Sequence, residues 1–324
     1  MCTAATYQTK NFYFGRTMDL EYDLTDDITI TPRHYPFHFH HMDAMHCHYA
    51  IIGMALVKND YPLYYDAVNE KGLGLAALRF EGGSMYQEFT PGKDNIAQYE
   101  LFPWLLGQCS TVKEARVLLE KVNFITTPFQ EDMPLSPLHW MLSDRSESIV
   151  IEPFGNTAKV YENPAGILTN NPAFETQVLQ LSNYMGLSPK PPQNFFSSKL
   201  PLKTCSLGMG AIGLPGDLSS QSRFVRATFV KMNSVCGESE ADSVSQFFHI
   251  LGCVNQQRGC NSLGDGKYQT TVYTSCCNGD KGIYYYTTYN NHQITAVNMY
   301  NENLDSALLV RFPAICEEQI KMQN

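Results

Sequence analysis

The second residue of this 324-residue chain is a cysteine, and its position gives the thiol unusual chemical possibilities. A small residue at position 2 normally allows removal of the initiator methionine, so Cys2 would carry a thiol and the free α-amino group together. An α-amino group titrates at about pH 8 and could relay a proton to and from a nucleophilic thiol. Small residues are also common at position 2 by accident, so the dipeptide alone leaves an inert Cys2 open.

A nucleophilic Cys2 needs a nearby cation, because a free thiol with a pKa of about 8.5 is mostly protonated at pH 7. The segment FGRTMD supplies Arg16 and Asp19 near the end of a strand expected over 11–20. The turn QTKN before it should pair this strand with an N-terminal strand. Arg16 would then favour the thiolate, and Asp19 would hold the amino group. The alternative is an ordinary surface ion pair.

Composition and charge exclude several classes of partner. Hydrophobic residues make up 44% and charged residues 17% of the chain, which is typical of a globular protein with a substantial core. The net charge of −9 argues against nucleic acid, whose phosphates demand clustered lysine and arginine, and does not help binding to an anionic membrane. No signal peptide is recognisable, and the longest apolar stretch, 49–57, is about half a membrane span. We expect a cytoplasmic protein without nucleic-acid or membrane partners.

The elements that must position these residues follow an alternating order. Strands are expected, with a turn at 69–72, over 11–20, 26–32, 49–59, 73–80, 138–144, 147–154, 157–163, 270–276, 282–289 and 293–299. Helices, the second with Thr111 and Glu114 in capping-box register, are expected over 95–109, 110–122, 173–185, 218–232 and 238–252. This order predicts an α+β fold with one or two large antiparallel sheets covered by helix pairs. The proline-rich segment 187–203 is expected to be an excursion loop rather than a domain boundary.

A histidine-rich segment is the main competing candidate for a functional site. Six of the nine histidines lie between His34 and His48, and imidazoles that alternate along a strand share a face, where they could bind zinc or nickel. A metal-binding sensor with an inert Cys2 is therefore open, as is a polar hairpin tip without a required metal. The ten cysteines contain no C-x-x-C pair and predict no zinc ribbon. GMGAIG at 208–213 matches a dinucleotide fingerprint only by letter, because LPGD follows where a helix should begin.

The chain resembles the choloylglycine hydrolases, with motifs in family order from end to end: MCTAATY, FGRTMDLEYD, NEKGLGLAAL, LHWMLSD, ILTNNPAF, GLPGDLSSQSRFVR and GIYYYTTYNN. Within the family it is most similar to the bacterial conjugated bile salt hydrolases, close relatives of penicillin V acylase. The resemblance implies an N-terminal-nucleophile hydrolase of αββα architecture, a single domain over 2–324 once Met1 is removed. It also implies cleavage of the amide between a bile acid and glycine or taurine, without metal or organic cofactor. A homotetramer contacting through a loop near 187–203 is implied as well.

The resemblance assigns a role to each site residue by motif. Cys2 matches the nucleophile, which would form a thioester with the acyl group. Arg16 and Asp19 match the pair that polarises the thiol and holds the amino group. Asn170, the first asparagine of TNNP, matches the side-chain donor to the oxyanion, and Arg223 of SRFVR matches the second arginine of the site.

One position departs from the family pattern. Arg79 stands where bile salt hydrolases have asparagine and penicillin V acylases tend to have tyrosine, at a residue whose backbone N–H donates to the oxyanion. A backbone donor survives a side-chain change, so we expect catalysis to persist. The Arg79 guanidinium could pair with the sulfonate of taurine or the carboxylate of glycine, or it could point to solvent. Met18 and Leu20 are expected walls of the substrate pocket, and penicillin V acylase or another N-acyl amidase remains an alternative activity.

Overall fold

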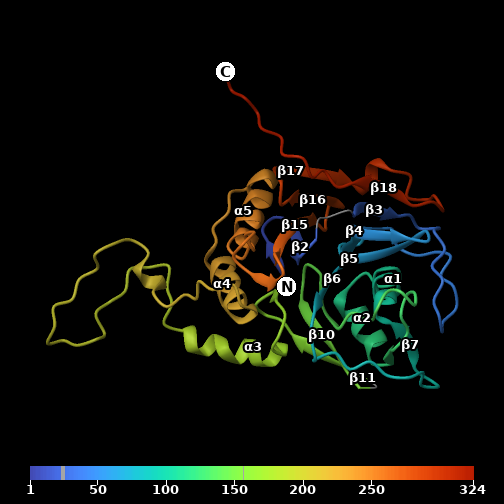
Figure 1. The fold of residues 1–324 in the computed structure, drawn as a ribbon, viewed down its shortest axis with the longest axis horizontal. Coiled ribbons are helices and arrows are strands. Elements are labelled where there is room, and N and C mark those ends of the chain that lie inside the picture. The colour runs from blue at the N-terminus through green and yellow to red at the C-terminus, as the bar shows by residue number, and fades with distance from the viewer. Residues whose placement is uncertain (23–25, 156) are drawn as a thin grey trace.

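Two large antiparallel sheets lie face to face in the computed structural model, which describes residues 1–22, 26–155 and 157–324 (Figure 1). The first sheet has the spatial order β12 (Ile167–Leu168), β1 (Cys2–Gln8), β2 (Phe12–Leu20), β15 (Thr270–Asn278), β16 (Ile283–Thr288) and β17 (Asn291–Asn298). The second has the order β11 (Thr157–Glu162), β10 (Ser148–Phe154), β9 (Leu138–Ser143), β6 (Gly74–Arg79), β5 (Tyr61–Asn69), β4 (Ile51–Lys58), β3 (Asp27–Thr31) and β18 (Val310–Pro313).

Helices cover the outer face of each sheet. The first sheet packs against α4 (Ser220–Asn233) and α5 (Glu240–Gly252), and the second against α1 (Leu101–Leu106) and α2 (Val112–Leu119) (Figure 1). The remaining elements are short: α3 (Phe174–Gln180), the 3₁₀ turns at Gln98–Glu100, Leu181–Tyr184, Met209–Ala211 and Met299–Asn301, the hairpin β13 (Ser262–Gly264) with β14 (Lys267–Tyr268), and the parallel pair β7 (Asp94–Ala97) and β8 (Val122–Ile125). The αββα layering expected from the sequence is confirmed.

Alternating side chains explain why the second sheet is buried on both faces. On β4, Ile52 faces the first sheet, whereas its neighbour Ile51 packs toward α1 and α2. On β9, Met141 likewise faces the first sheet, and its neighbour Trp140 packs toward α1 and α2. Successive side chains of a strand point to opposite faces, so a strand that is apolar at every position must be covered on both sides. Four layers are the consequence.

Side-chain caps begin the three longest helices, and the cap predicted at Thr111 is confirmed. Thr111 precedes α2, and its hydroxyl accepts a hydrogen bond from the Glu114 amide at 3.2 Å. The Glu114 carboxylate reaches back to the amide of Ser110 at 2.6 Å rather than to that of Thr111. Ser219 caps α4 and Ser239 caps α5 in the same manner. These caps satisfy amides that would otherwise lack partners in the first helical turn.

The helix predicted over 95–109 is wrong in its first part. Residues Asp94–Ala97 form β7, which pairs in parallel with β8 and buries Ile96. The apolar spacing of this segment suits a helix, but the ladder to β8 and the packing of Ile96 override that local preference. The helix itself is confined to Leu101–Leu106. The strand Tyr61–Asn69 was not predicted, although the turn expected at 69–72 connects it to β6.

The excursion expected at 187–203 has no strand or helix, and it extends away from the sheets in Figure 1. Phe195 and Phe196 on this loop are 87% and 81% exposed. Contiguous exposed apolar side chains of this kind can mark an interaction site when the patch is large. A role of the loop in subunit contacts stays a prediction. Within the described part of the chain, none of the helices combines the length and apolar character needed to cross a membrane.

Candidate active site

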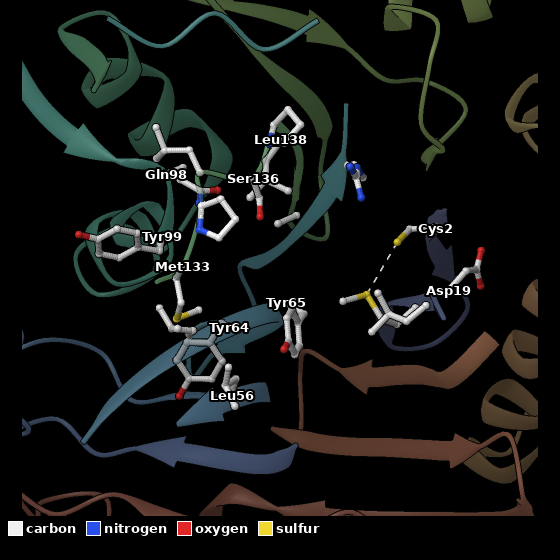
Figure 2. Close-up of a pocket in the computed structure, with 18 of the residues that line it drawn as sticks. Cys2, Asp19, Leu56, Tyr64, Tyr65, Gln98, Tyr99, Met133, Ser136 and Leu138 are labelled. Carbon is white, nitrogen blue, oxygen red and sulfur yellow. Dashed lines mark hydrogen bonds between the residues drawn. The ribbon is translucent and has the colours of Figure 1, made fainter. Parts of the chain in front are cut away.

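Cys2 is the first residue of β1 and lines a pocket (Figure 2). The residue pairs with Met18 across the β1–β2 ladder, and its side chain is almost fully buried. The Cys2 thiol lies 3.8 Å from the sulfur of Met18. The pocket has a volume of about 370 Å³ and is lined by Cys2, Arg16 and Asp19 on its inner side. The sequence-predicted pairing of the first two strands therefore brings the cation and the carboxylate to the thiol.

Arg16 is buried, so the alternative of a surface ion pair with Asp19 is excluded. Its guanidinium donates hydrogen bonds to the backbone carbonyls of Thr17 at 3.1 Å, Tyr65 at 3.0 Å and Ala77. One nitrogen, Nη2, has no hydrogen-bond partner in residues 1–22, 26–155 and 157–324. Burial of the guanidinium lowers the pKa of Arg16. The negative charges of neighbouring groups outweigh this effect and raise the pKa, and the largest of these contributions comes from Cys2 in its thiolate form. Arg16 is therefore a permanent cation beside the thiol.

Asp19 is also buried, and only one of its two oxygens has a partner among the described residues. Oδ1 accepts a hydrogen bond from the Thr271 hydroxyl at 2.7 Å, whereas no described residue donates to Oδ2. Burial raises the pKa of Asp19, and the attraction of Arg223, of the N-terminal ammonium and of Arg16 partly offsets this rise. A buried carboxylate oxygen without a partner is costly, and it is suited to an additional donor in the site.

Arg223 reaches the same point from α4. Its guanidinium donates to the carbonyl of Cys2 at 2.6 Å, to the hydroxyl of Thr3 at 2.6 Å and to Oδ1 of Asn170 at 2.8 Å. Burial lowers the pKa of Arg223, and the negative charge of Asp19 counteracts this effect. The second arginine inferred by resemblance thus contacts the backbone of Cys2, and the described hydrogen bonds include none from it to the Cys2 sulfur.

Asn170 connects three parts of the site through its side-chain amide. Oδ1 accepts from the backbone N–H of Cys2 at 2.8 Å and from Arg223, while Nδ2 donates to the backbone carbonyl of Arg79 at 2.8 Å. The five residues predicted as catalytic therefore lie together, although 168 residues separate Cys2 from Asn170. With Met1 present, the terminal amino group donates to the Asp19 backbone carbonyl and to Gln269, both at 3.0 Å.

The Arg79 side chain lies at the pocket rim and is 64% exposed. Its guanidinium pairs with the neighbouring carboxylate of Glu81 at 2.7 Å, so without a ligand it faces largely toward solvent. The Arg79 backbone carbonyl contacts Asn170 as described. A residue of an antiparallel strand directs its N–H and C=O to the same edge, so the Arg79 N–H faces the side on which Asn170 lies.

Apolar side chains form most of the pocket wall. Met18 and Leu20 line it, in agreement with the sequence-based expectation that they lie beside the site. The sequence did not indicate the other apolar and aromatic lining residues, which include Tyr22, Leu56, Leu63, Tyr64, Tyr65, Phe102, Phe129, Met133, Leu135 and Leu138. Figure 2 shows Tyr64, Tyr65, Met133 and Leu138 across the cavity from Cys2. Four of these residues, Phe129, Met133, Leu135 and Leu138, lie in the segment 129–138. Its prolines and its apolar residues without periodicity were the sequence signal that this segment could line a pocket.

A buried carboxylate behind Arg16 was also missed. Asp66 on β5 accepts hydrogen bonds from the hydroxyls of Tyr273 at 2.5 Å, Ser275 at 2.8 Å and Tyr284 at 2.8 Å. The Ser275 hydroxyl in turn accepts from the backbone N–H of Arg16 at 3.0 Å. Burial raises the pKa of Asp66, and the positive charge of Arg16 works against it. An aspartate inside the otherwise apolar run of β5 was the sequence signal for this group.

The histidine segment does not form a metal centre in the described residues, which contain no group of three or more histidine, cysteine, aspartate or glutamate side chains able to hold an ion. Phe37 and Met45 pair as an isolated bridge, consistent with a hairpin tip. His40 contacts Glu100 and Tyr99, and His48 is buried with both ring nitrogens on backbone carbonyls. These contacts give His40 and His48 structural partners.

Asp26, whose carboxylate accepts from the pocket residue Tyr65 at 3.4 Å, should make stability depend on pH. Burial raises its pKa from 3.8 to about 6. The folded state therefore binds this proton more tightly than the unfolded chain, and its stabilising effect is lost as the pH rises through 6.

An Asp26→Asn variant is expected to raise the free energy of unfolding at pH 7.5 by about 2–3 kcal/mol and to change it much less at pH 4. Urea denaturation at both pH values measures the difference, with the exposed Asp132→Asn as control. Equal effects at the two pH values would contradict the assignment.

Comparison with known proteins identifies the family. The model of the linear amide C–N hydrolases, choloylglycine hydrolase family, matches residues 2–312. The chain is 52% identical over 324 residues to a bile salt hydrolase/transferase of Lactiplantibacillus plantarum, covering 100% of both chains. It is 38% identical over 310 residues to a bile salt hydrolase/transferase of Clostridium perfringens, covering 94% of each.

Solved structures agree with these relatives. A cysteine-to-alanine mutant of the conjugated bile acid hydrolase from Clostridium perfringens superposes with a TM-score of 0.92 at 36% identity, covering 100% of both chains. Penicillin V acylase from Agrobacterium tumefaciens shares the fold, with a TM-score of 0.73 at 18% identity over 96% of this chain and 90% of that one. The chain therefore belongs to the choloylglycine hydrolase family and is an amide-cleaving hydrolase.

Proposed function

We propose that this protein is a conjugated bile salt hydrolase that releases glycine or taurine from a bile acid through a Cys2 thioester. The observation that carries the proposal is Cys2, next to the chain terminus, beside two buried arginines and at the inner end of a largely apolar pocket. The names of the full-length relatives support the substrate class. Removal of Met1 is part of the proposal, since it makes the Cys2 nitrogen a free amine.

The first step is attack of the Cys2 thiolate on the amide carbonyl. Arg16 is the fixed positive charge that favours the thiolate over the thiol. The α-ammonium of Cys2 gives a proton to the departing nitrogen, so the C–N bond breaks as glycine or taurine leaves and a C–S bond to the acyl group remains. Oδ2 of Asp19, which has no partner in the described part of the chain, offers this ammonium an acceptor in addition to Oδ1 of Asn170.

Negative charge develops on the carbonyl oxygen during this attack. Nδ2 of Asn170 has two N–H groups, and the contact with the Arg79 carbonyl occupies one of them. The second N–H and the backbone N–H of Arg79, which faces the same edge, are the proposed oxyanion donors. Arg223 holds Asn170 by its oxygen, which keeps the amide nitrogen directed away from Arg223. Water, deprotonated by the free α-amine, then hydrolyses the thioester.

The apolar pocket supports a steroid acyl group. A rigid, mostly apolar body gains roughly 25 cal/mol for each Å² removed from water, so recognition can depend mainly on this half of the substrate. Because an acyl-enzyme forms, an amine could replace water in the second step, and transfer of amino acids onto bile acids is a proposed side activity. We further propose a single domain over 2–324, a homotetramer that uses the exposed 187–203 loop, and a cytoplasmic location.

Penicillin V acylase activity is the second candidate. The solved acylase is only 18% identical, and its likeness concerns the fold. The two activities are separated by measuring amine release from taurocholate, glycocholate and penicillin V, each with and without EDTA. Release of taurine or glycine that survives EDTA is expected. Turnover of penicillin V alone would move the protein to the acylase activity, and release abolished by EDTA would contradict a mechanism based on Cys2 without metal.

Arg79→Asn tests the leaving-group side of the pocket. We propose that the guanidinium exchanges Glu81 for the sulfonate or carboxylate of the substrate, since an exposed ion pair is weak and easily broken. The variant is expected to raise KM for both conjugates by about tenfold with little change in kcat, because the contact is made in ground state and transition state alike. Glu81→Gln, which frees Arg79, is the control and should not raise KM. Unchanged kinetics of Arg79→Asn would reject the pairing.

A further inference from the structure

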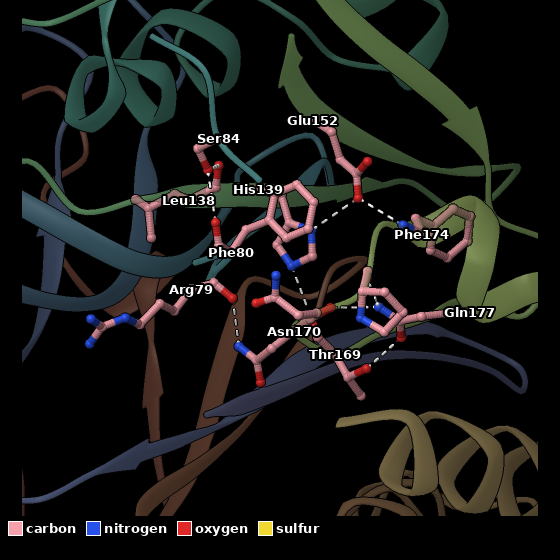
Figure 3. Close-up of polar contacts among 12 residues, drawn as sticks. Arg79, Phe80, Ser84, Leu138, His139, Glu152, Thr169, Asn170, Phe174 and Gln177 are labelled. Atoms are coloured by element: carbon pink, nitrogen blue, oxygen red, sulfur yellow. Dashed lines mark hydrogen bonds and ion pairs between the residues drawn. The ribbon is translucent and has the colours of Figure 1, made fainter. Parts of the chain in front are cut away.

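His139 on β9 is fully buried and lies directly behind the loop that carries Asn170 (Figure 3). Its Nε2 lies 2.8 Å from the backbone carbonyl of Thr169, the residue before Asn170. Its ring stacks on Phe80, the residue after Arg79, with a centroid distance of 4.5 Å and an interplanar angle of 7°. His139 thus contacts the chain neighbours of both partners in the hydrogen bond from Asn170 to Arg79.

The second ring nitrogen of His139 is held by a carboxylate. Nδ1 lies 3.3 Å from Oε1 of Glu152 on β10, and this oxygen also accepts from the backbone N–H of Phe174 at 2.9 Å. Nε2 faces a carbonyl oxygen and must therefore carry a hydrogen. Nδ1 faces a carboxyl oxygen, so a further proton has to lie between His139 and Glu152 for this contact to be a hydrogen bond. The arrangement is that of a buried histidine–carboxylate pair with one N–H committed to Thr169.

Gln177 on α3 secures the same loop from the other side. Its amide nitrogen donates to the carbonyl of Asn170 at 2.5 Å and to that of Pro172 at 2.7 Å, and its oxygen accepts from the Thr169 hydroxyl at 2.6 Å. The backbone carbonyls of Thr169, Asn170 and Pro172 are therefore each bound by a buried side chain.

We propose that His139, held by Glu152, is a positioning residue of the hydrolase site. It fixes Phe80 and Thr169 relative to each other, and so sets the direction in which Nδ2 of Asn170 points. The inference deepens the proposed function, because it depends on Asn170 as an oxyanion donor. It concerns the amide-hydrolysing step and not the choice of acyl group, so it applies to whichever amide the protein cleaves.

The test is a double variant, His139→Phe with Glu152→Gln. The phenyl ring keeps a stacking partner for Phe80 but cannot donate to Thr169, and the glutamine avoids leaving a buried charge without a partner. We expect kcat for amide release to fall by about tenfold to a hundredfold, as for a small misplacement of a catalytic group, with KM within about threefold. Glu152→Gln alone keeps an oxygen that can accept from the Phe174 N–H and leaves His139 its Nε2–H for Thr169, so it should retain kcat within about threefold.

Alkylation of Cys2 by iodoacetamide separates positioning from a general structural effect. This reaction needs the thiolate but no oxyanion donor, so its rate in the double variant should stay within about twofold, measured by mass spectrometry of the N-terminal peptide. His48→Phe is the matched control, because His48 is a buried histidine with two backbone carbonyl partners remote from Asn170. It should leave kcat unchanged even where it lowers the melting temperature.

Either of two results would overturn the proposal. The first is a folded double variant whose kcat stays within about threefold of the parent value. The second is a double variant in which kcat and the rate of Cys2 alkylation fall together, with the same losses in the His48→Phe control. If the double variant does not fold, His139→Gln keeps a polar group at this position and is judged by the same criteria. Penicillin V is assayed beside the conjugated bile acids. Parent turnover of penicillin V alone would reject the proposed substrate while still testing His139.

Discussion

A Cys2→Ala variant is expected to lose amide hydrolysis by at least about 10⁴-fold while remaining folded. The thiol is the only sulfur nucleophile among the described residues lining the pocket, and the methyl group of alanine fits at its buried position. Arg16, Asn170 and Arg223 would still bind and orient the substrate, but no covalent bond to the acyl group could form. Release of glycine and taurine under saturating substrate measures the loss.

Two further variants show that this loss is chemical. Cys277→Ala removes another buried thiol from the first sheet and is expected to leave kcat unchanged. Cys2→Ser keeps a hydroxyl that is a much weaker nucleophile and should be nearly as inactive as alanine. Thermal unfolding should be similar for all three proteins. Hydrolysis that persists in Cys2→Ala would reject the nucleophile, and with it the thioester mechanism.

Asn170→Asp is expected to lower kcat by about 10²–10³-fold, the usual cost of losing one oxyanion donor. A carboxylate of the same shape can still accept from the Cys2 nitrogen and from Arg223. It cannot donate to the Arg79 carbonyl, and its negative charge would repel both that carbonyl and a developing oxyanion. The expected signature is a fall in kcat with little change in KM.

The adjacent asparagine is the matched control for this substitution. Asn171 donates through its side chain to the Glu81 carbonyl at 2.8 Å and contacts neither Cys2 nor Arg223 in the described hydrogen bonds. Asn171→Asp introduces the same charge one residue away and should leave kcat within about threefold. Equal losses in the two variants would mean that the charge, and not the lost donor at position 170, causes the effect.

The group around Cys2 was predictable from the sequence where the contacts are local. Cys2, Arg16 and Asp19 lie on two strands joined by a short turn, and the register of such a hairpin follows from its alternating side chains. The same reasoning applies to the caps of α2, α4 and α5, where the chemistry lies within four residues. Local rules fail at β7, because its partner β8 is contributed by a separate segment.

The sequence by itself predicted most of the strands and helices in their order, a candidate nucleophile with its neighbouring charges, and, through its motifs, the family. Only the tertiary structure decided that Asn170 and Arg223 meet at Cys2, that the 129–138 segment walls the pocket, and that His139 lies behind Asn170. The physical reason is distance along the chain. Arg223 is 221 residues from Cys2. Local sequence periodicity predicts secondary structure and cannot predict that two residues so far apart are in contact. Packing of two sheets and their helices is what brings them together.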